Sequence, residues 1–431
     1  MVDASAQLLL TEIGKKVDNF SSPRGMRDFY PEDMVLRNRI FDAWRAAAVA
    51  SGFEQYDSCV VETLELLQRK AGEEIVDQIY AFKDKSDRDL ALRPEMTPTL
   101  ARMVVARQGS LRFPIKWFTI AQCFRYERTT RGRKREHYQL NLDIIAEESI
   151  SAEAEVLFAA VSALRKMGVP DEAYRIRVSN RALLSELLLS LGVKEQFHQG
   201  AFIALDKKGK IPREQIEAIL REEGLDDEAC TAAFNLMDIS SLEDAEKLVG
   251  EGSPAVKQLR ELFALLDAYG IGGQAVFDIS VIRGLSYYTG IVFEAFDTKG
   301  EFRAVFGGGR YDNLLSTIGG DPAPAVGLGF GDVVVGELIK ALDLPATEEK
   351  ELIVLGYMSD EQRFATTKLA AKLRAEGKAV SLMTHKQKPK AFFSTAAEKG
   401  SHAIYIGPDD CEKGVAKLKN LATREETEIS L

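Results

Sequence analysis

The chain has 431 residues, 45% of them hydrophobic and 28% charged, so it is long enough for two or three domains of roughly 150 residues, each with a core. Its formal net charge of −10 argues against a nucleic-acid binder with an overall basic surface, because such proteins neutralise phosphates with an excess of Lys and Arg. Any nucleic-acid contact must then come from a local basic patch.

Cysteine and histidine spacing argues against a disulfide scaffold or a zinc site. The four cysteines and four histidines are scattered without a close pair, whereas both kinds of site need tighter spacing. No apolar run approaches the roughly 18 residues of a membrane helix, and the N-terminus does not resemble a secretory signal. We expect reduced thiols, no metal held by the protein, no membrane association and a cytoplasmic location.

The first predicted helix begins at Pro31. Proline fits the first turn of a helix, and the acids at positions 32 and 33 suit the positive end of its dipole. Apolar residues then recur at helical spacing until Gly52, namely Leu36, Ile40, Trp44 and Ala47. We expect this helix to be scaffold, preceded by a lead-in segment at residues 1–22.

Two strands joined by a basic loop are predicted at residues 115–127 and 138–147. Period-two alternation places Gln139, Asn141 and Asp143 on one face of the second strand, while Arg125 and Glu127 share a face of the first. Because unpaired buried charges are costly, this polar face meets either solvent or a polar pocket, and alternation alone leaves both open. The basic loop suits either a triphosphate or an RNA end, or is simply solvated; its cations are Arg128, Arg131, Arg133, Lys134 and Arg135.

Beyond residue 169 the character of the sequence changes three times. Residues 170–270 are rich in Glu, Lys and Leu at helical spacing and predict a mainly helical insertion. Strand-like sequence resumes at 271–341, and the acidic, proline-bearing stretch at 342–350 is typical of a linker. Residues 351–431 alternate between strand and helix patterns, which predicts a small α/β domain.

Four further segments hold polar groups or glycines at constrained positions. In LRPEMTP (92–98), two prolines fix Glu95 and Thr97 in a turn that suits a ligand ammonium group. RGLSYYTG (283–290) offers two tyrosine hydroxyls beside glycines that admit a ligand closely. GGGRYD (307–312) lacks the Gly-Lys-Ser/Thr ending of a phosphate-binding P-loop. GLGFG (327–331) is compatible with a strand under a flat ligand. Each segment alone also suits an ordinary turn or core strand.

Together and in this order, these segments resemble the histidyl-tRNA synthetases, a family of class II aminoacyl-tRNA synthetases. SPRGMRDFYPEDM is similar to the family's segment leading into its dimer-forming first motif, and LRPEMTPTLAR to its histidine-binding segment. FRYERTTRGRKREHYQLNLD is similar to the second class motif, and RGLSYYTGIVFE to the signature of histidine specificity. The similarity runs from about Pro23 through the C-terminal domain.

The resemblance implies an α+β fold built on the class II antiparallel sheet flanked by helices. It makes residues 1–169 and 271–341 the two parts of the catalytic domain, interrupted by the helical insertion at 170–270. After the linker at 342–350, residues 351–431 would form the α/β anticodon-binding domain.

The resemblance also implies roles for individual residues. Asp143 and Tyr288 would meet the imidazole of histidine, and the full histidine-binding set would be Glu95, Met96, Thr97, Gln139, Asp143, Tyr287 and Tyr288. The ATP-binding set would be Arg125, Glu127 and Arg133. Arg125 and Arg283 would be catalytic, because fixed positive charges at the α-phosphate stabilise the charge that builds up during attack.

The activity implied is histidine–tRNA ligation. Histidine and ATP, which carries Mg²⁺, would form histidyl-adenylate and pyrophosphate, and the histidine would then pass to the 3′ end of tRNA(His). The expected partners are L-histidine, tRNA(His) and a second copy of the chain in a homodimer.

The chain departs from the family pattern at three places. Val333-Val334 stand where the third class motif ends in Glu-Arg, Ser286 stands where Asp is commoner, and Thr129-Thr130 replace Pro-Gln. The missing arginine motivates one alternative, a catalytically inactive regulatory subunit. A second alternative is an RNA-binding module that keeps only the fold.

Overall fold

The computed structural model describes residues 20–69, 77–208, 211–282, 288–345 and 351–431. The chain divides into two compact units, Met1–Ala346 and Thr347–Leu431. Within the described residues, no helix is both long and apolar enough to cross a membrane.

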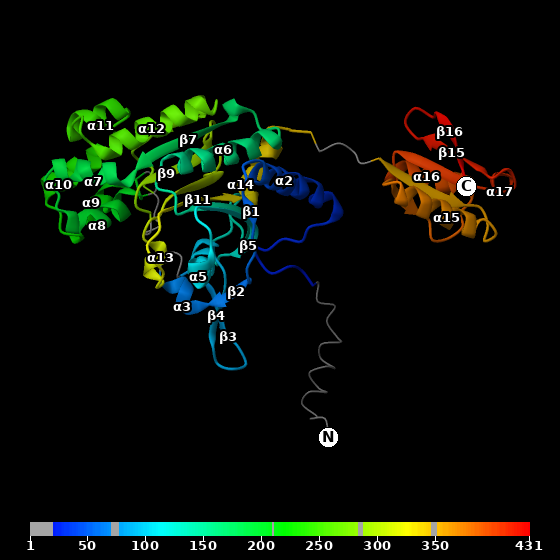
Figure 1. Ribbon diagram of the computed structural model, residues 1–431, viewed down its shortest axis with the longest axis horizontal. Coiled ribbons are helices and arrows are strands. Elements are labelled where there is room, and N and C mark those ends of the chain that lie inside the picture. Colours follow the sequence, from blue (N-terminus) through cyan, green and yellow to red (C-terminus); the bar gives the residue numbers. More distant parts are fainter. Residues whose placement is uncertain (1–19, 70–76, 209–210, 283–287, 346–350) are drawn as a thin grey trace, which may run out of the picture. The chain divides into compact units, whose positions relative to one another are not determined.

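An eight-stranded sheet forms the centre of the first unit (Figure 1). Its strands, in spatial order, are β1 (Glu54–Gln55), β5 (Ile115–Phe124), β6 (Glu136–Ile145), β11 (Ala325–Gly331), β10 (Phe306–Arg310), β9 (Ile291–Asp297), β7 (Tyr174–Asn180) and β8 (Ala275–Phe277). All neighbours are antiparallel except at the two edges, where β1 runs parallel to β5 and β8 parallel to β7. The expected α+β architecture with a mainly antiparallel sheet is confirmed.

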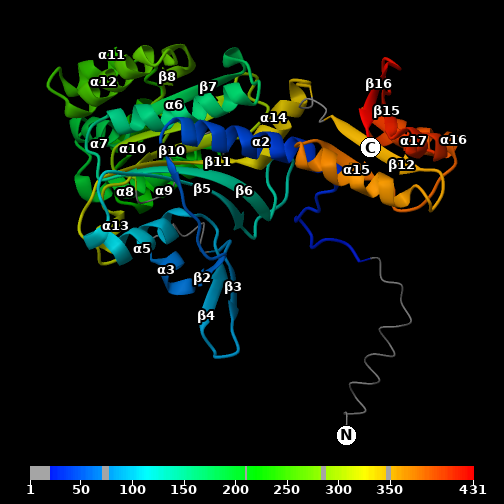
Figure 2. The ribbon, with the colours of Figure 1, turned by 45° about the vertical axis from the view of Figure 1, so that its right-hand side comes forward.

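Helices cover one face of this sheet. They are α2 (Pro31–Ala50), α6 (Ser151–Lys166) and α14 (Asp332–Ala341), which lie beside one another above the strands (Figure 2). Period two sends Leu140, Leu142 and Ile144 of β6 into the same apolar cluster as Trp44 of α2. The main core of the unit therefore lies on this side of the sheet.

The opposite face carries α5 (Thr97–Arg107) and a smaller apolar cluster that includes Leu100, Ala121 and Ile145. A three-stranded sheet lies next to it, and its β3–β4 hairpin projects from the unit (Figure 2). Its strands are β2 (Val61–Thr63), β3 (Tyr80–Lys83) and β4 (Asp89–Leu92), and the short α3 (Leu64–Gln68) follows β2 and contacts it. The short α13 (Leu314–Thr317) packs against α5. This second face is the one to which Asn141 and Asp143 point.

The helices expected at 170–270 are present. They are α7 (Arg181–Ser190), α8 (His198–Leu205), α9 (Arg213–Glu222), α10 (Asp227–Leu236), α11 (Leu242–Val249) and α12 (Pro254–Ala268). The same range also contains β7, a strand of the main sheet that the helical interpretation did not anticipate. Its Tyr174, Ile176 and Val178 alternate and are fully buried, because this face of the strand packs into the main core.

The second unit holds a five-stranded sheet in the order β13-β12-β14-β15-β16. Its elements along the chain are β12 (Leu352–Tyr357), α15 (Arg363–Ala375), β13 (Ala379–Leu382), α16 (Pro389–Lys399), β14 (His402–Ile406), α17 (Pro408–Lys413), β15 (Val415–Asn420) and β16 (Glu426–Ser430). Parallel pairing of β12 with β13 and β14 is typical of strand–helix–strand crossovers.

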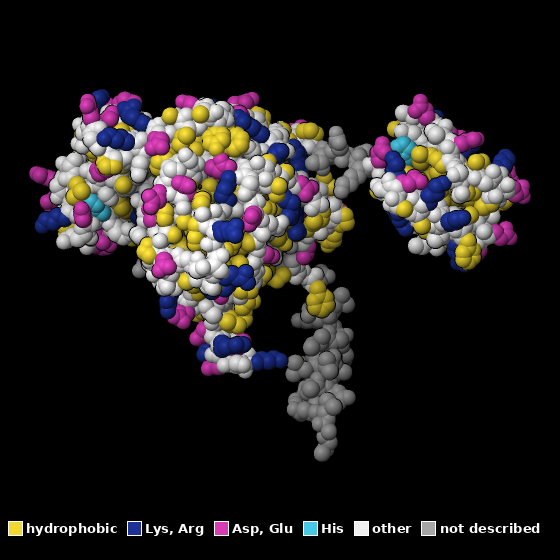
Figure 3. Space-filling model, in the orientation of Figure 1, with side chains coloured by type: hydrophobic (Ala, Val, Ile, Leu, Met, Phe, Trp, Pro, Cys, Tyr) yellow, Lys and Arg dark blue, Asp and Glu magenta, His cyan; other side chains and the backbone are white. Residues whose placement is uncertain are grey.

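Charges of both signs are interspersed over the face of the first unit seen in Figure 3. This mixture agrees with the slightly acidic composition. Contact with a polyanion would therefore depend on local groups of cations rather than on the general surface.

Candidate functional site

A polar cavity of about 130 Å³ lies on the α5 side of the large sheet. The residues that line it come from strands β6, β10 and β11, from the first residue of α5 and from four connecting segments. They are Glu95, Thr97, Arg125, Gln139, Asn141, Asp143, Tyr288, Gly307, Tyr311, Gly327, Leu328 and Gly329. Six of the residues implied by the sequence resemblance are therefore brought together: Glu95, Thr97, Arg125, Gln139, Asp143 and Tyr288.

Strand β6 supplies the polar floor of the cavity. Gln139, Asn141 and Asp143 alternate with Leu140 and Leu142, so that the polar side chains line the cavity while the leucines enter the core. Gln139 Nε2 donates to Asn141 Oδ1 at 3.0 Å. The two readings left open by the alternation are resolved in favour of a polar pocket, since both Asn141 and Asp143 are only 2% exposed.

Asp143 is the most deeply buried acid of the cavity. Tyr311 donates its hydroxyl to Asp143 Oδ1 at 2.5 Å, whereas Oδ2 is buried without a hydrogen-bond partner among the described residues. Burial raises the pKa of Asp143 to about 7, and the Glu95 carboxyl adds to the rise while the Tyr311 hydrogen bond opposes it. The carboxyl thus has one oxygen held by the protein and one available to a ligand donor.

Glycines in β11 make room for these side chains. Gly327 lies opposite Asp143 in the sheet register, and a Cβ at position 327 would overlap Asp143 Oδ1. A Cβ at position 329 would likewise overlap Gln139 Nε2. The alternating small residues of GLGFG are therefore required by the polar side chains of the neighbouring strand.

The turn before α5 supplies the opposite wall. Thr97 is the first residue of α5, and Glu95 is 5% exposed beside it. Arg93 fixes the turn by donating from Nε to the Gln122 carbonyl at 2.9 Å. Arg125 Nε donates to the Pro94 carbonyl at 3.0 Å, which ties the end of β5 to the same turn. Acidic, hydroxyl and guanidinium groups thus converge on one cavity.

The basic loop lies outside the cavity lining. Arg133 Nε pairs with Glu127 Oε2 at 3.0 Å, and Thr130 and Arg133 form an isolated bridge across the loop. The loop is further attached to α14 by the ion pair of Arg131 with Glu337 at 2.8 Å. The two loop residues implied to bind ATP, Glu127 and Arg133, therefore hold each other.

Met96 is placed differently from the other described residues that the resemblance implies. Met96 is fully buried in the apolar cluster around α5 and does not line the cavity, because the turn directs its side chain into the core between Glu95 and Thr97. Histidine binding by the Met96 side chain is thus not supported by this geometry. Arg283 and Tyr287 lie outside the described residues.

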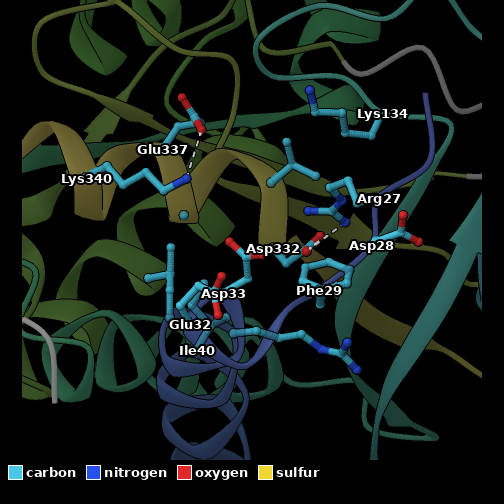
Figure 4. A pocket seen from close by; sticks show the side chains of 14 residues that line it. Arg27, Asp28, Phe29, Glu32, Asp33, Ile40, Lys134, Asp332, Glu337 and Lys340 are labelled. Carbon is cyan, nitrogen blue, oxygen red and sulfur yellow. Dashed lines mark ion pairs between the residues drawn. The ribbon is translucent and has the colours of Figure 1, made fainter. Parts of the chain in front are cut away.

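A second and larger cavity, of about 450 Å³, lies between the segment 27–29, the first turns of α2 and helix α14 (Figure 4). Four of its charged groups form ion pairs: Arg27 with Asp332 at 3.0 Å and with Glu136 at 2.6 Å, and Lys340 with Glu337 at 3.7 Å. Of the expected histidine-binding and ATP-binding residues that the structure describes, none lines it. The two ion pairs of Arg27 tie the segment before α2 to the start of β6 and to the start of α14.

Two polar lining residues were not in the expected set. Asn141 shares the polar face of β6, so its period-two position could have identified it. Tyr311 belongs to the segment GGGRYD, whose glycines and arginine predict a turn or a strand but assign no role to the tyrosine. Its partner Asp143 is 168 positions away in the chain, and local sequence patterns carry no signal for such a contact.

Comparisons with known proteins agree with this geometry. The family described as histidyl-tRNA synthetase matches residues 25–331, and the family described as anticodon binding domain matches residues 352–431. A chloroplastic/mitochondrial histidine–tRNA ligase of Arabidopsis thaliana is 43% identical, with 97% of this chain and 86% of that protein covered. The histidine–tRNA ligase of Opitutus terrae is 39% identical, with 95% and 96% covered.

A solved structure shares the fold. The histidyl-tRNA synthetase of Nostoc sp. PCC 7120 superimposes with a TM-score of 0.78 at 24% identity, covering 96% of this chain and 97% of that chain. This likeness shows the fold alone, while the family match over most of the first unit and the two relatives show the relationship. The chain belongs to the histidyl-tRNA synthetase family.

Proposed function

We propose that the chain is a histidine–tRNA ligase that activates histidine with ATP and transfers it to the 3′ end of tRNA(His). The observation that carries this proposal is the polar cavity on the α5 side of the sheet. There a buried carboxyl, Asp143, faces the same small space as the acid Glu95 and the cation Arg125. An amino acid with a hydrogen-bond donor in its side chain suits such a space.

The ammonium group and the imidazole of the bound histidine would contact different residues of the cavity. Its ammonium group would meet Glu95 and Gln139, together with Tyr287, and its imidazole would meet Asp143 and Tyr288. Thr97 also lines the cavity. Because Asp143 is nearly fully buried and its Oδ2 has no hydrogen-bond partner among the described residues, a ligand that donates to it relieves the cost of an unpaired buried oxygen.

ATP would approach from the side of Arg125. The histidine carboxylate attacks the α-phosphorus in line, the bond to the bridging oxygen breaks, and pyrophosphate leaves with the displaced electron pair. Arg125 and Arg283 would neutralise charge at the α-phosphate. Glu127 and Arg133 would be ATP-side contacts, and their ion pair would open or shift as the triphosphate binds. Mg²⁺ would enter with the phosphates as part of the substrate.

Transfer would follow when a ribose hydroxyl at the tRNA 3′ end attacks the mixed anhydride and AMP leaves. The match of residues 352–431 to the anticodon binding domain supports tRNA as the partner. We further propose a homodimer built through the first motif. The expected cytoplasmic location stays a prediction, and the organellar relative in Arabidopsis thaliana makes fractionation the relevant measurement.

Histidine-dependent exchange of pyrophosphate into ATP tests the proposal. Purified protein should exchange with histidine and with none of the other amino acids, and Arg125→Ala should lose most of the rate because the α-phosphate loses its fixed cation. Folded protein that supports no exchange with any amino acid would refute the ligase function.

An inactive regulatory subunit is the other candidate, and Val334 in place of the third-motif arginine favours it. Retention of the polar cavity and of the C-terminal domain supports the ligase instead. Adenylate formation distinguishes the two candidate functions: a ligase forms histidyl-adenylate from histidine and ATP, whereas a regulatory subunit binds histidine without forming it.

A further inference from the structure

The connection between β9 and β10, residues 298–305, leads directly to the polar cavity. It ends where β10 begins at Phe306, and the next residue, Gly307, lines that cavity. The connection carries one arginine, Arg303, and the side chain of this residue is exposed. No role assigned so far uses its guanidinium group.

The protein itself fixes the backbone of this connection. The buried Asp297 carboxylate accepts hydrogen bonds from the backbone N–H groups of Glu301 and Phe302, both at 2.9 Å. At the end of the connection, the Val305 N–H donates to the Ala295 carbonyl at 2.7 Å. The residues between these two anchors are therefore held from both sides.

Arg303 lies against the tip of the basic loop. Its Cγ lies 4.0 Å from the place of a Cβ on Gly132, and Val334 Cγ2 lies 3.8 Å from the same place. The residue before Gly132, Arg131, places its guanidinium over the Phe302 ring, 5.0 Å from the centroid. The side chain of Arg303 thus meets the loop beside Val334, which stands where the third class motif has an arginine.

We propose that Arg303 is a further ATP-binding residue, whose guanidinium contacts the β- and γ-phosphates in place of an arginine on α14. The inference rests on the ligase function proposed above and adds a residue to its ATP contacts. A guanidinium can pair with phosphate oxygens through two parallel hydrogen bonds. Arg125 lines the cavity at the proposed α-phosphate, and Arg133 lies in the basic loop. A third cation beside the loop tip suits the part of the triphosphate that extends beyond the cavity.

The role assigned to Arg303 concerns only the phosphates that leave in the reaction. Pyrophosphate consists of the former β- and γ-phosphates, so a cation bound to them contacts ATP before the reaction and pyrophosphate after it. Histidine and histidyl-adenylate carry neither phosphate. The loss of Arg303 should therefore weaken the binding of ATP and of pyrophosphate alike, and leave the binding of histidine and of the adenylate as it was.

The test is Arg303→Ala in pyrophosphate exchange. We expect the KM values for ATP and for pyrophosphate each to rise about tenfold to a hundredfold, the range for a hydrogen bond to a charged group, with the KM for histidine unchanged. Inhibition by a non-hydrolysable analogue of histidyl-adenylate should also be unchanged, because the analogue has no β- or γ-phosphate. Arg303→Lys should recover part of the loss, since lysine keeps the charge but not the bidentate geometry.

Lys299→Ala is the matched control. Lys299 lies in the same connection and is also exposed, so its removal takes one positive charge from the same segment. All three KM values should be unchanged in this variant. A loss equal to that of Arg303→Ala would indicate general attraction of an anion to the segment, and it would overturn the specific contact.

The outcomes separate the inference from the function on which it rests. Wild-type protein without histidine-dependent exchange would remove the ligase function, and the inference with it. Active wild type with unchanged KM values for ATP and pyrophosphate in Arg303→Ala would overturn the role of Arg303 and leave the ligase function standing. An equal loss for histidine, or weaker binding of the adenylate analogue, would overturn that role as well, because the whole site would then be disturbed. If Arg303→Ala fails to fold, Arg303→Gln in folded protein must show the same selective loss, and its absence would overturn the inference.

Discussion

The ion pair between Arg310 and Glu153 offers a quantitative test of how the site is held. Glu153 lies on α6 and is fully buried, Arg310 at the end of β10 is 7% exposed, and two bonds of 2.6 and 2.7 Å join them. Burial raises the pKa of Glu153, against the lowering effect of Arg310. The cost of desolvation therefore offsets most of the attraction, as is common for buried pairs.

Breaking the pair from one side should be far more harmful than removing it whole. Glu153→Met leaves a guanidinium that cannot lose its proton, and we expect a loss of about 3–5 kcal/mol in the free energy of unfolding. Two backbone carbonyls still accept from Arg310, which favours the lower end of the range. The double variant Glu153→Met/Arg310→Met replaces both charges by apolar side chains of similar length and should recover much of the loss.

Tryptophan fluorescence during urea unfolding measures these losses in the relevant unit. The two tryptophans of the chain, Trp44 and Trp117, both lie in the first unit, so the second unit does not contribute to the signal. The two single variants and the double variant complete a double-mutant cycle. Additive losses, with the double variant less stable than either single one, would refute the reasoning that an uncompensated charge dominates.

Three further predictions concern the cavity. Asp143→Asn should raise the KM for histidine at least tenfold while leaving that for ATP unchanged; equal effects on both substrates would contradict the imidazole contact. Because the pKa of Asp143 is raised to about 7, its carboxyl passes from mostly protonated at about pH 6 to mostly ionised at about pH 8. Histidine affinity should therefore rise over this range, and the rise should be smaller in Asp143→Asn. Gly327→Ala should abolish pyrophosphate exchange, because the added Cβ overlaps Asp143 Oδ1. Gly331→Ala should retain exchange, because no atom lies within 4 Å of its added Cβ. Similar activity in both variants would show that β11 shifts to accommodate the methyl group at position 327.

Period two in β6 predicted correctly which side chains share a face, because alternation is a local property of an extended strand. It left open what that face meets, which depends on α5, on Tyr311 and on the strand register with β11. The partners of Asp143 in that set, Gly327 and Tyr311, lie more than a hundred residues further along the chain. Contacts of this kind follow from the fold and not from the neighbouring sequence.

The strand β7 shows the opposite situation, in which a local signal was present. Tyr174, Ile176 and Val178 alternate with polar residues, but the helical pattern on their C-terminal side dominated the interpretation of residues 170–270. Period two over seven residues is a weaker signal than six successive helices. The large sheet consequently extends into the range assigned to the insertion.

Val334 shows where the sequence identified a difference but not its meaning. The sequence indicated only that an arginine of the third class motif is absent. In the structure Val334 lies in α14, is 8% exposed and belongs to the main apolar cluster. Its Cγ2 also lies 3.8 Å from the place of a Cβ on Gly132, at the tip of the basic loop. An apolar side chain there stabilises by packing and offers no charge to a nucleotide. Besides Arg283 and Arg303, the cations proposed for ATP are therefore Arg125 at the start of that loop and Arg133 within it.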